Sequence, residues 1–306
     1  MKNKKNVLLV YYSQTGQLKQ LAEKFVSPLS NHDEINLETL AIKPEVSYQF
    51  PWSFIRFFDT FPETVRLTPA PIITPEFKQQ KYDLVILAYT VWFLSPAQPI
   101  TAFLQHEKTK AILANTPIVT LIGCRNMWLM AQETVKKHLK EAQANLVDNV
   151  VRIDSCGGPA SFIATPLWMF TGSKQPVSWL PKAGISEEDI NECTKYGEKI
   201  KSVLLTQPFI NEPMLKNMAA VKVNERLILS EKFGHRSFNF WGKWIIQAGT
   251  ISPYLRHALL YFYILFLITV ILTVVPISAL IKLLLSPWLK NKIHKQKSLF
   301  SWPSGE

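Results

Sequence analysis

A short polar motif near the start of the chain, Tyr12-Ser-Gln-Thr-Gly-Gln17, has the residue types of a phosphate-binding loop. A phosphate dianion needs several hydrogen-bond donors that converge from one side, with no acidic side chain among them. The hydroxyls of Ser13 and Thr15 meet this need, together with backbone N–H groups if a helix begins here. Gly16 would let the backbone turn close to the ligand. The alternative is an ordinary Ser/Thr helix cap, which uses the same residues.

The segments around this motif predict that it lies between a strand and a helix. Short apolar, β-branched runs are typical of strands buried on both faces, and apolar residues spaced by three and four are typical of helices. Strands are predicted at 7–12, 35–40, 83–89, 118–122 and 146–153, and helices at 18–26, 128–142 and 186–205. This alternation indicates βαβ units with right-handed crossovers. We therefore predict an α/β fold, a doubly wound five-stranded parallel sheet, in residues 1–207.

The position of the motif favours the phosphate interpretation, because doubly wound folds bind ligands at the carboxyl ends of their strands. Here the chain resembles the flavodoxin family, whose first loop reads aromatic–Ser/Thr–x–Thr–Gly and is matched by Tyr12-Ser-Gln-Thr-Gly16. The resemblance covers residues 5–205 and implies a flavodoxin-like domain that binds FMN. Family members often continue with Asn-Thr, where this chain has Gln17-Leu18, so one hydroxyl donor is missing. The GxGxxG fingerprint of NAD-binding folds is absent from this turn.

The family resemblance also implies which loops hold the flavin ring, namely those after the third and fourth strands. They correspond to Thr90-Val-Trp-Phe-Leu-Ser-Pro96 and Gly123-Cys-Arg-Asn-Met-Trp128. Trp92 and Phe93 are candidates for stacking on the ring, with core packing as the alternative. Arg125 would stabilise anionic reduced flavin near N1/O2, or is a solvated loop residue. The predicted cofactor-binding residues are Ser13, Gln14, Thr15, Gly16, Gln17, Leu18, Thr90, Val91, Trp92, Phe93, Gly123, Cys124, Arg125 and Asn126.

Four motifs carry a closer resemblance. They are Tyr11-Tyr-Ser-Gln-Thr-Gly-Gln17, Val91-Trp-Phe-Leu-Ser-Pro96, Gly123-Cys-Arg-Asn-Met-Trp128 and Pro166-Leu-Trp-Met-Phe-Thr-Gly172. The set is similar to the flavodoxin-like proteins associated with dialkylresorcinol biosynthesis. This resemblance implies a ketosynthase-type pathway partner and the oxidation of a cyclohexanedione-like intermediate to an aromatic ring.

Two connections, residues 41–80 and 154–185, are longer than the predicted sheet needs, and both are rich in aromatic residues. Loops of this length are usually functional or disordered, and aromatic content argues against disorder. In the first connection, spacings of three and four place five aromatic residues on one helical face, which are Phe50, Phe54, Phe57, Phe58 and Phe61. We expect this face to receive an apolar substrate, with packing on the sheet as the alternative.

The C-terminal third combines positive charge with an uncharged apolar segment. Residues 206–306 carry 12 Lys/Arg against 4 Asp/Glu, whereas residues 1–205 carry 22 against 19. Residues 258–281 form 24 positions without a charge, which is long enough to span a bilayer core. A buried soluble helix is the alternative. Such a basic, apolar region indicates contact with anionic membrane lipids.

We therefore predict a basic amphipathic connector at 208–257, a hydrophobic membrane segment at 258–285 and a basic tail at 286–306. Pro276 could kink one span or mark the tip of a re-entrant hairpin, and basic residues on both flanks leave the topology open. A single span would place the lysines of the tail outside the cell, against the positive-inside tendency, which favours a hairpin or a segment that lies in the plane of the membrane. The expected location is the cytoplasmic face of the cell membrane, anchored through residues 258–285.

Other chemistry finds little support in the sequence. Cys124, Cys156 and Cys193 are scattered, so neither a metal site nor a disulfide framework is predicted. No nucleic-acid recognition motif accompanies the positive charge. The six histidines do not cluster, and the catalytic residues stay unassigned.

These features predict a membrane-anchored FMN-dependent oxidoreductase that acts on a lipid-like or aromatic substrate, and the closer resemblance implies a dehydrogenating aromatisation. One alternative is an NAD(P)H-dependent quinone reductase. The others are a membrane-tethered electron carrier and a flavin-free interaction module. Electron-transfer flavodoxins tend to be acidic, so the balance of +3 in residues 1–205, which is 22 minus 19, argues against a carrier.

Overall fold

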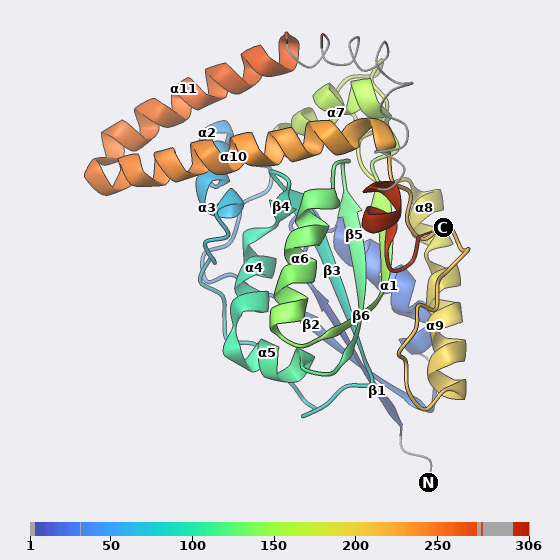
Figure 1. The fold of residues 1–306 in the computed structure, drawn as a ribbon. Coiled ribbons are helices and arrows are strands. Elements are labelled where there is room, and N and C mark those ends of the chain that lie inside the picture. The colour runs from blue at the N-terminus through green and yellow to red at the C-terminus, as the bar shows by residue number, and fades with distance from the viewer. Residues whose placement is uncertain (1–3, 31, 274–276, 278–295, 306) are drawn as a thin grey trace.

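The computed structural model describes residues 4–30, 32–273, 277 and 296–305, and its centre is a single sheet (Figure 1). The strands are β1 (Lys5–Tyr11), β2 (Ile35–Ala41), β3 (Leu84–Trp92), β4 (Ser95–Pro96), β5 (Pro117–Cys124) and β6 (Asn145–Ile153). Five of them run parallel in the order β2-β1-β3-β5-β6. This is the order of flavodoxin-like doubly wound folds, with the topological switch point between β1 and β3. The predicted α/β class and parallel sheet are confirmed.

The predicted number of five strands is wrong, because the sheet has a sixth strand. β4 pairs antiparallel with Val91 and Trp92 at the end of β3. The chain reverses at Phe93 and Leu94, whose backbones are both left-handed with φ of 48° and 61°. Large residues rarely adopt this conformation, and glycine, the usual residue at such a turn, is absent here. The local sequence therefore does not predict the reversal.

Helices cover both faces of the sheet. The described helices are α1 (Gln17–Ser30), α2 (Phe54–Asp59), α3 (Phe61–Val65), α4 (Gln98–Gln105), α5 (Glu107–Leu113), α6 (Leu129–Glu141), α7 (Gly158–Thr171), α8 (Glu187–Glu192), α9 (Thr194–Thr206), α10 (Glu225–Ile251) and α11 (Pro253–Leu272). One core lies between the sheet and α4, α5 and α6, and a second lies between the sheet and α1, α8 and α9.

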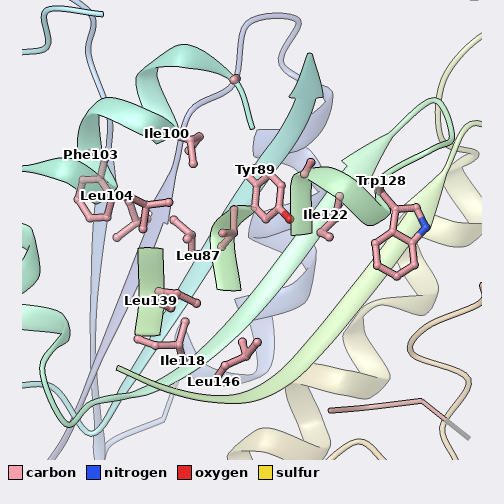
Figure 2. Close-up of a cluster of buried hydrophobic side chains, with 14 of the residues drawn as sticks. Leu87, Tyr89, Ile100, Phe103, Leu104, Ile118, Ile122, Trp128, Leu139 and Leu146 are labelled. Atoms are coloured by element: carbon pink, nitrogen blue, oxygen red, sulfur yellow. The ribbon is translucent and has the colours of Figure 1, made fainter. Parts of the chain in front are cut away.

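Alternate side chains of each strand enter the two cores. In β1, Leu8 and Val10 face the α4–α6 side, whereas Val7 and Leu9 face the α1–α9 side. Figure 2 shows the first core, where the labelled side chains of β3, β5 and β6 meet those of α4 and α6, together with Trp128 just before α6; they are Leu87, Tyr89, Ile100, Phe103, Leu104, Ile118, Ile122, Trp128, Leu139 and Leu146.

Two helices differ in extent from their prediction. The helix predicted at 18–26 continues through Pro28, whose ring lies against the Gly197 position of α9, so packing between the helices sustains the last turn. The helix predicted at 186–205 is divided into α8 and α9 at Cys193. There the backbone makes 3₁₀-type hydrogen bonds, from the N–H of Cys193 to the carbonyl of Ile190 and from the N–H of Tyr196 to the carbonyl of Cys193. Ser186 caps α8, because its hydroxyl accepts the N–H of Asp189 (3.1 Å).

The single aromatic helical face expected in residues 41–80 is also wrong. Phe50 precedes α2, and Phe61 begins the separate helix α3. Phe54 on α2 is 46% exposed, whereas Phe61 is fully buried. The two aromatic side chains therefore have different environments, although the sequence pattern treats them alike.

The α/β unit continues beyond residue 207, into the segment predicted as a connector. Met214 and Leu215 are buried, and their N–H groups donate to the Asp148 carboxylate of β6 (2.8 and 3.2 Å). The N–H of Val151 donates to the carbonyl of Ala220 (2.9 Å). Residues 210–223 therefore cover the β6 edge of the sheet, which would otherwise expose unpaired backbone groups.

α10 and α11 form a hairpin over the carboxyl ends of the strands, at the end of the molecule opposite the N-terminus (Figure 1). Among the described residues, α11 is the one helix long and apolar enough to cross a membrane, judged by length and composition alone. The predicted membrane segment at 258–285 lies partly outside the described residues, as does most of the tail at 286–306.

We expect a chain that ends after residue 224 to be more stable than one that ends after residue 207. The shorter chain loses the cover of β6 and leaves the Asp148 carboxylate without the N–H groups of Met214 and Leu215, which should cost at least about 3 kcal/mol. Urea unfolding of the two truncated proteins measures the difference. Both lack α10 and α11, so equal unfolding midpoints would show that residues 208–223 do not stabilise the sheet.

Candidate cofactor-binding site

The three loops predicted to bind a cofactor lie at the carboxyl ends of neighbouring strands. Residues 13–18 follow β1, residues 90–93 surround the end of β3, and residues 123–126 surround the end of β5. β3 lies between the other two strands, with Tyr11 paired with Ala88 and Thr90 paired with Gly123. The fold thus brings together residues that are far apart in the chain. Their role as cofactor ligands stays a prediction.

The loop after β1 forms an exposed turn at the N-terminus of α1. The N–H of Lys19 donates to Ser13 Oγ (3.2 Å), and the N–H of Gln17 donates to Thr15 Oγ1 (3.4 Å), so both hydroxyls cap the helix. A hydroxyl that accepts one bond can still donate its own hydrogen. Gly16 has φ of 83° and open space where a Cβ would lie. An anion can therefore approach this turn from solvent.

Gln14 and Gln17 attach the two long connections to this loop. Gln14 Nε2 donates to the carbonyl of Gln49 (3.0 Å), and its Oε1 accepts the indole N–H of Trp52 (3.1 Å). Gln17 Nε2 donates to the carbonyl of Ile185 (3.1 Å), and its Oε1 accepts the N–H of the same residue (3.0 Å). Because both amides are occupied, these residues offer a ligand their backbone groups.

Trp92 lies within an aromatic cluster that sequence reasoning missed. Its ring is close to Tyr12, Tyr48 and Trp52, with centroids 6.0, 5.0 and 5.7 Å away and all three contacts edge-to-face. Phe93 is half-buried beside Phe57. The present contacts of Trp92 are those of core packing, so its stacking on a flavin stays a prediction. The one sequence signal for Tyr48 and Trp52 is the aromatic content of the connection that carries them.

The residues at the ends of β3 and β5 are tightly packed. The carbonyl of Thr90 accepts the N–H of Ala97 (3.1 Å). A Cβ on Gly123 would come within 3.0 Å of Leu18 Cδ1, so this glycine permits the close approach of α1. Burial raises the pKa of the Cys124 thiol far above its usual value. The thiol therefore stays protonated and is a packing group.

Arg125 is directed toward α7. Its Nη1 donates to Ser161 Oγ (3.1 Å), and its guanidinium lies over the Phe162 ring, 4.4 Å from the centroid. Burial lowers the pKa of Arg125, while the nearby Asp154 carboxylate opposes this shift. Asn126 Oδ1 accepts the N–H of the following residue (2.9 Å). Arg125 is therefore a partly buried cation beside the carboxyl edge, and its contacts with α7 fix its orientation. It is not the solvated loop residue that the sequence left as an alternative.

Asp154 is a second residue that sequence reasoning missed. It directly follows β6, and its carboxylate accepts the N–H of Cys156 (2.9 Å) and the hydroxyl of Thr165 (2.9 Å). These bonds anchor the start of the second long connection and α7. Its place one position after a predicted strand is the signal that could have identified it, since doubly wound folds gather functional groups there.

Two cavities lie beside the two long connections. The larger, about 320 Å³, is lined by Gln49 and by Tyr48, Trp52, Gln98 and Arg256 among others. The smaller, about 290 Å³, is lined by Ile185, Ser155, Cys156, Lys174 and Gly184 among others. Gln49 and Ile185 are the residues bonded to Gln14 and Gln17, so each cavity lies beside one long connection. The larger volume falls at the lower end of the range for small-molecule sites.

A buried carboxylate from α10 lies at the N-terminus of α6. Glu231 Oε1 accepts the N–H of Met130 (2.7 Å), whereas Oε2 is buried without a hydrogen-bond partner in the described part of the chain. Burial raises the pKa of Glu231 to about 7. The contact joins α10 to the helix that follows β5, and therefore to the edge that carries the candidate site.

Comparison with known proteins gives distant structural matches. No family model matches the chain, and no curated protein matches it. A flavoprotein from Lactobacillus acidophilus NCFM, solved in complex with FMN, is 19% identical over 48% of this chain and 93% of its own, with a TM-score of 0.39. A WrbA-like flavodoxin from Agrobacterium tumefaciens is 10% identical over 66% of this chain and 98% of its own, with a TM-score of 0.36. An oxidoreductase from Corynebacterium diphtheriae is 12% identical over 67% of this chain and 100% of its own, with a TM-score of 0.35. The flavodoxin-like class of this chain rests on its own strand order.

The raised pKa of Glu231 predicts that stability falls as the pH rises from about 4.5 to about 7. In this window the folded protein keeps a proton that the unfolded chain releases, so the loss reaches up to about 3 kcal/mol. Glu231→Gln keeps an acceptor for the N–H of Met130 and should flatten this part of the pH dependence. Urea unfolding across the window measures both slopes, and Glu212→Gln at an exposed position is the control. An unchanged slope in Glu231→Gln would contradict the assignment.

Proposed function

We propose that the chain binds FMN and is an FMN-dependent oxidoreductase. The observation that carries the proposal is the exposed turn at residues 15–16, at the N-terminus of α1 and at the switch point between β1 and β3. The FMN complex of the Lactobacillus acidophilus flavoprotein, although distant, is consistent with this cofactor. The chemistry that FMN supplies when bound is reversible two-electron transfer.

The residues at this edge fit the proposed cofactor. Residues 13–18 contain no acidic side chain, and the open space at Gly16 leaves room for a phosphate beside the first N–H groups of α1. Arg125 would place a cation near the ring, where Ser161 and Phe162 hold its orientation. Trp92 and Phe93 would border the ring from the end of β3.

The proposed substrate is lipid-like or aromatic, and the proposed location is the membrane. Large apolar side chains are exposed on α7, α10 and α11, among them Phe162, Ile163, Phe240 and Leu265. These helices lie at the end of the molecule that carries the carboxyl edge of the sheet (Figure 1). An apolar substrate would be most concentrated in the bilayer, close to that edge. Attachment at the cytoplasmic face of the cell membrane supplies the site with such a substrate.

Within this class, the motif resemblance favours a dehydrogenating aromatisation of the dialkylresorcinol type. The substrate would be a cyclohexanedione-like ring with apolar chains, delivered by a ketosynthase-type partner. A quinone reductase fed by NAD(P)H is the second candidate, because the same apolar helices would give a membrane quinone access to the site. Bleaching of the flavin absorbance by a cyclohexanedione without NADPH favours the first candidate, and bleaching that requires NADPH favours the second.

We expect the purified protein to be yellow and to release FMN, not FAD, when denatured. The double variant Ser13→Ala and Thr15→Ala should bind FMN more weakly by about 2–3 kcal/mol, since two charge-assisted hydrogen bonds are lost. Flavin fluorescence on titration with FMN measures the affinity. Ser252→Ala, which removes the hydroxyl cap of α11, is the control for a lost helix cap alone. Equal FMN affinity in the double variant and the parent protein would exclude these hydroxyls as phosphate ligands.

Phe54 and Phe61 form a matched pair for testing the aromatic connection. Phe54 is half-exposed and contacts Phe170 of α7, with centroids 5.5 Å apart, whereas Phe61 is fully buried and stacks on Tyr263 at 4.4 Å. Phe61→Ala should destabilise the fold by about 3–5 kcal/mol. Phe54→Ala should leave the melting temperature and FMN content nearly unchanged, yet lower turnover of a long-chain substrate more than that of a short-chain analogue. Equal loss on both substrates would argue against a substrate-receiving role for Phe54.

A further inference from the structure

The two faces of α11 are both apolar, but they have different surroundings. One face packs inward through Leu260, Tyr263 and Ile264, which are buried against α3 and α10. The opposite face is exposed over the whole helix and carries Tyr254, Ala258, Tyr261, Leu265, Ile268 and Leu272. A soluble helix would place polar residues on this outward face. The outward face therefore requires an apolar environment that the described part of the chain does not supply.

The inward face joins α11 to the α/β unit along much of its length. Near its start, Arg256 donates two hydrogen bonds to Glu63 (2.7 and 3.0 Å) and one to Asp59 Oδ1 (3.0 Å). Two turns later, Tyr263 stacks on Phe61 with ring planes 10° apart. Leu267 packs in the same cluster. The contacts extend over twelve positions of the helix, from 256 to 267, which is about 16 Å at 1.5 Å per residue.

These contacts are incompatible with a helix that crosses a bilayer. If α11 stood across the hydrocarbon core, α3 and α10 would have to enter the core beside it, together with Asp59, Glu63 and Lys243. Charged side chains in the core of a membrane are costly and rare. The alternative is for α11 to leave the α/β unit, which would break the ion pairs of Arg256 and expose Phe61.

The exposed side of α10 has the composition of a helix that lies at a membrane surface. Three basic side chains are exposed on it and alternate with three large aromatic ones; in chain order they are Arg226, Phe233, Arg236, Phe240, Lys243 and Trp244. The acidic Glu231 is buried, and Glu225 forms an ion pair with Lys297. Basic residues interleaved with aromatic ones bind anionic head groups and the interface beneath them.

We propose that α11 lies in the plane of the membrane and does not cross it. Its outward face enters the boundary between head groups and acyl chains of an anionic bilayer, and α10 contacts the head groups. The inference rests on the membrane attachment proposed above and specifies its geometry. The carboxyl edge of the sheet then faces the membrane, so an apolar substrate reaches the candidate site from one leaflet.

The depth of three labelled positions tests this geometry. Ala258, Leu265 and Leu272 are exposed and seven residues apart, so they share one side of α11 and are separated by about 10 Å each. Each is replaced by Cys in the full chain and labelled with an environment-sensitive fluorophore. Depth is read from quenchers placed at different positions along the lipid, in vesicles of phosphatidylglycerol and phosphatidylcholine. The unsubstituted protein is the labelling control, because Cys124, Cys156 and Cys193 are buried.

Equal depth at the three positions, within a few ångströms, would support the in-plane geometry. A depth that changes by about 10 Å between neighbouring labels would overturn it in favour of a spanning helix, while leaving the membrane attachment intact. Absence of lipid contact at all three labels would overturn the attachment as well. Labels shielded without vesicles, in a protein of doubled mass, would instead assign the face to a second copy of the chain. FMN content, measured on the same samples, reports separately on the proposed cofactor.

Discussion

A parallel sheet must be covered on both faces, and most of this architecture follows from that constraint. Leu8 and Val10 of β1 need helices on one side, and Val7 and Leu9 need helices on the other. The chain therefore leaves β1 toward one face and β3 toward the other, and the two strands are neighbours. The helices that connect the parallel strands leave the carboxyl edge between β1 and β3 free, and the candidate site lies at this edge.

The additions to this core gather at the same edge, and each is attached by polar contacts. Gln14 holds the first long connection, Gln17 holds the second, and Asp154 anchors α7 through Thr165. Glu231 ties α10 to the N-terminus of α6, and Arg256 ties α11 to α2 and α3. A buried or half-buried polar group that loses its partner is costly, so these contacts specify position as well as contributing stability.

The distribution of charge agrees with this division of the molecule. Residues 1–205 have nearly balanced charge, whereas residues 206–306 carry the basic excess. On α10 the exposed charged residues are Arg226, Arg236 and Lys243, and they alternate with aromatic side chains. Basic charge and apolar surface therefore occur together at the end that carries the candidate site. For a substrate that partitions into lipid, binding to the membrane and access to the site would depend on the same surface.

The sequence by itself determined the α/β class, the five parallel strands and the turn after β1, because each depends on residues that are neighbours in the chain. Short, β-branched apolar runs such as residues 84–89 are typical of strands buried on both faces, and Ser and Thr are favoured caps at the start of a helix. Tertiary structure decided what depends on distant residues. The reversal that forms β4, the split between α2 and α3, and the aromatic cluster of Tyr48, Trp52 and Trp92 have no local periodic signal. The apolar run in α11 looks the same in sequence whether the helix crosses a membrane or lies on it. Only the contacts of its inward face distinguish the two, since a side chain such as Tyr263 finds its partner about two hundred positions away in the chain.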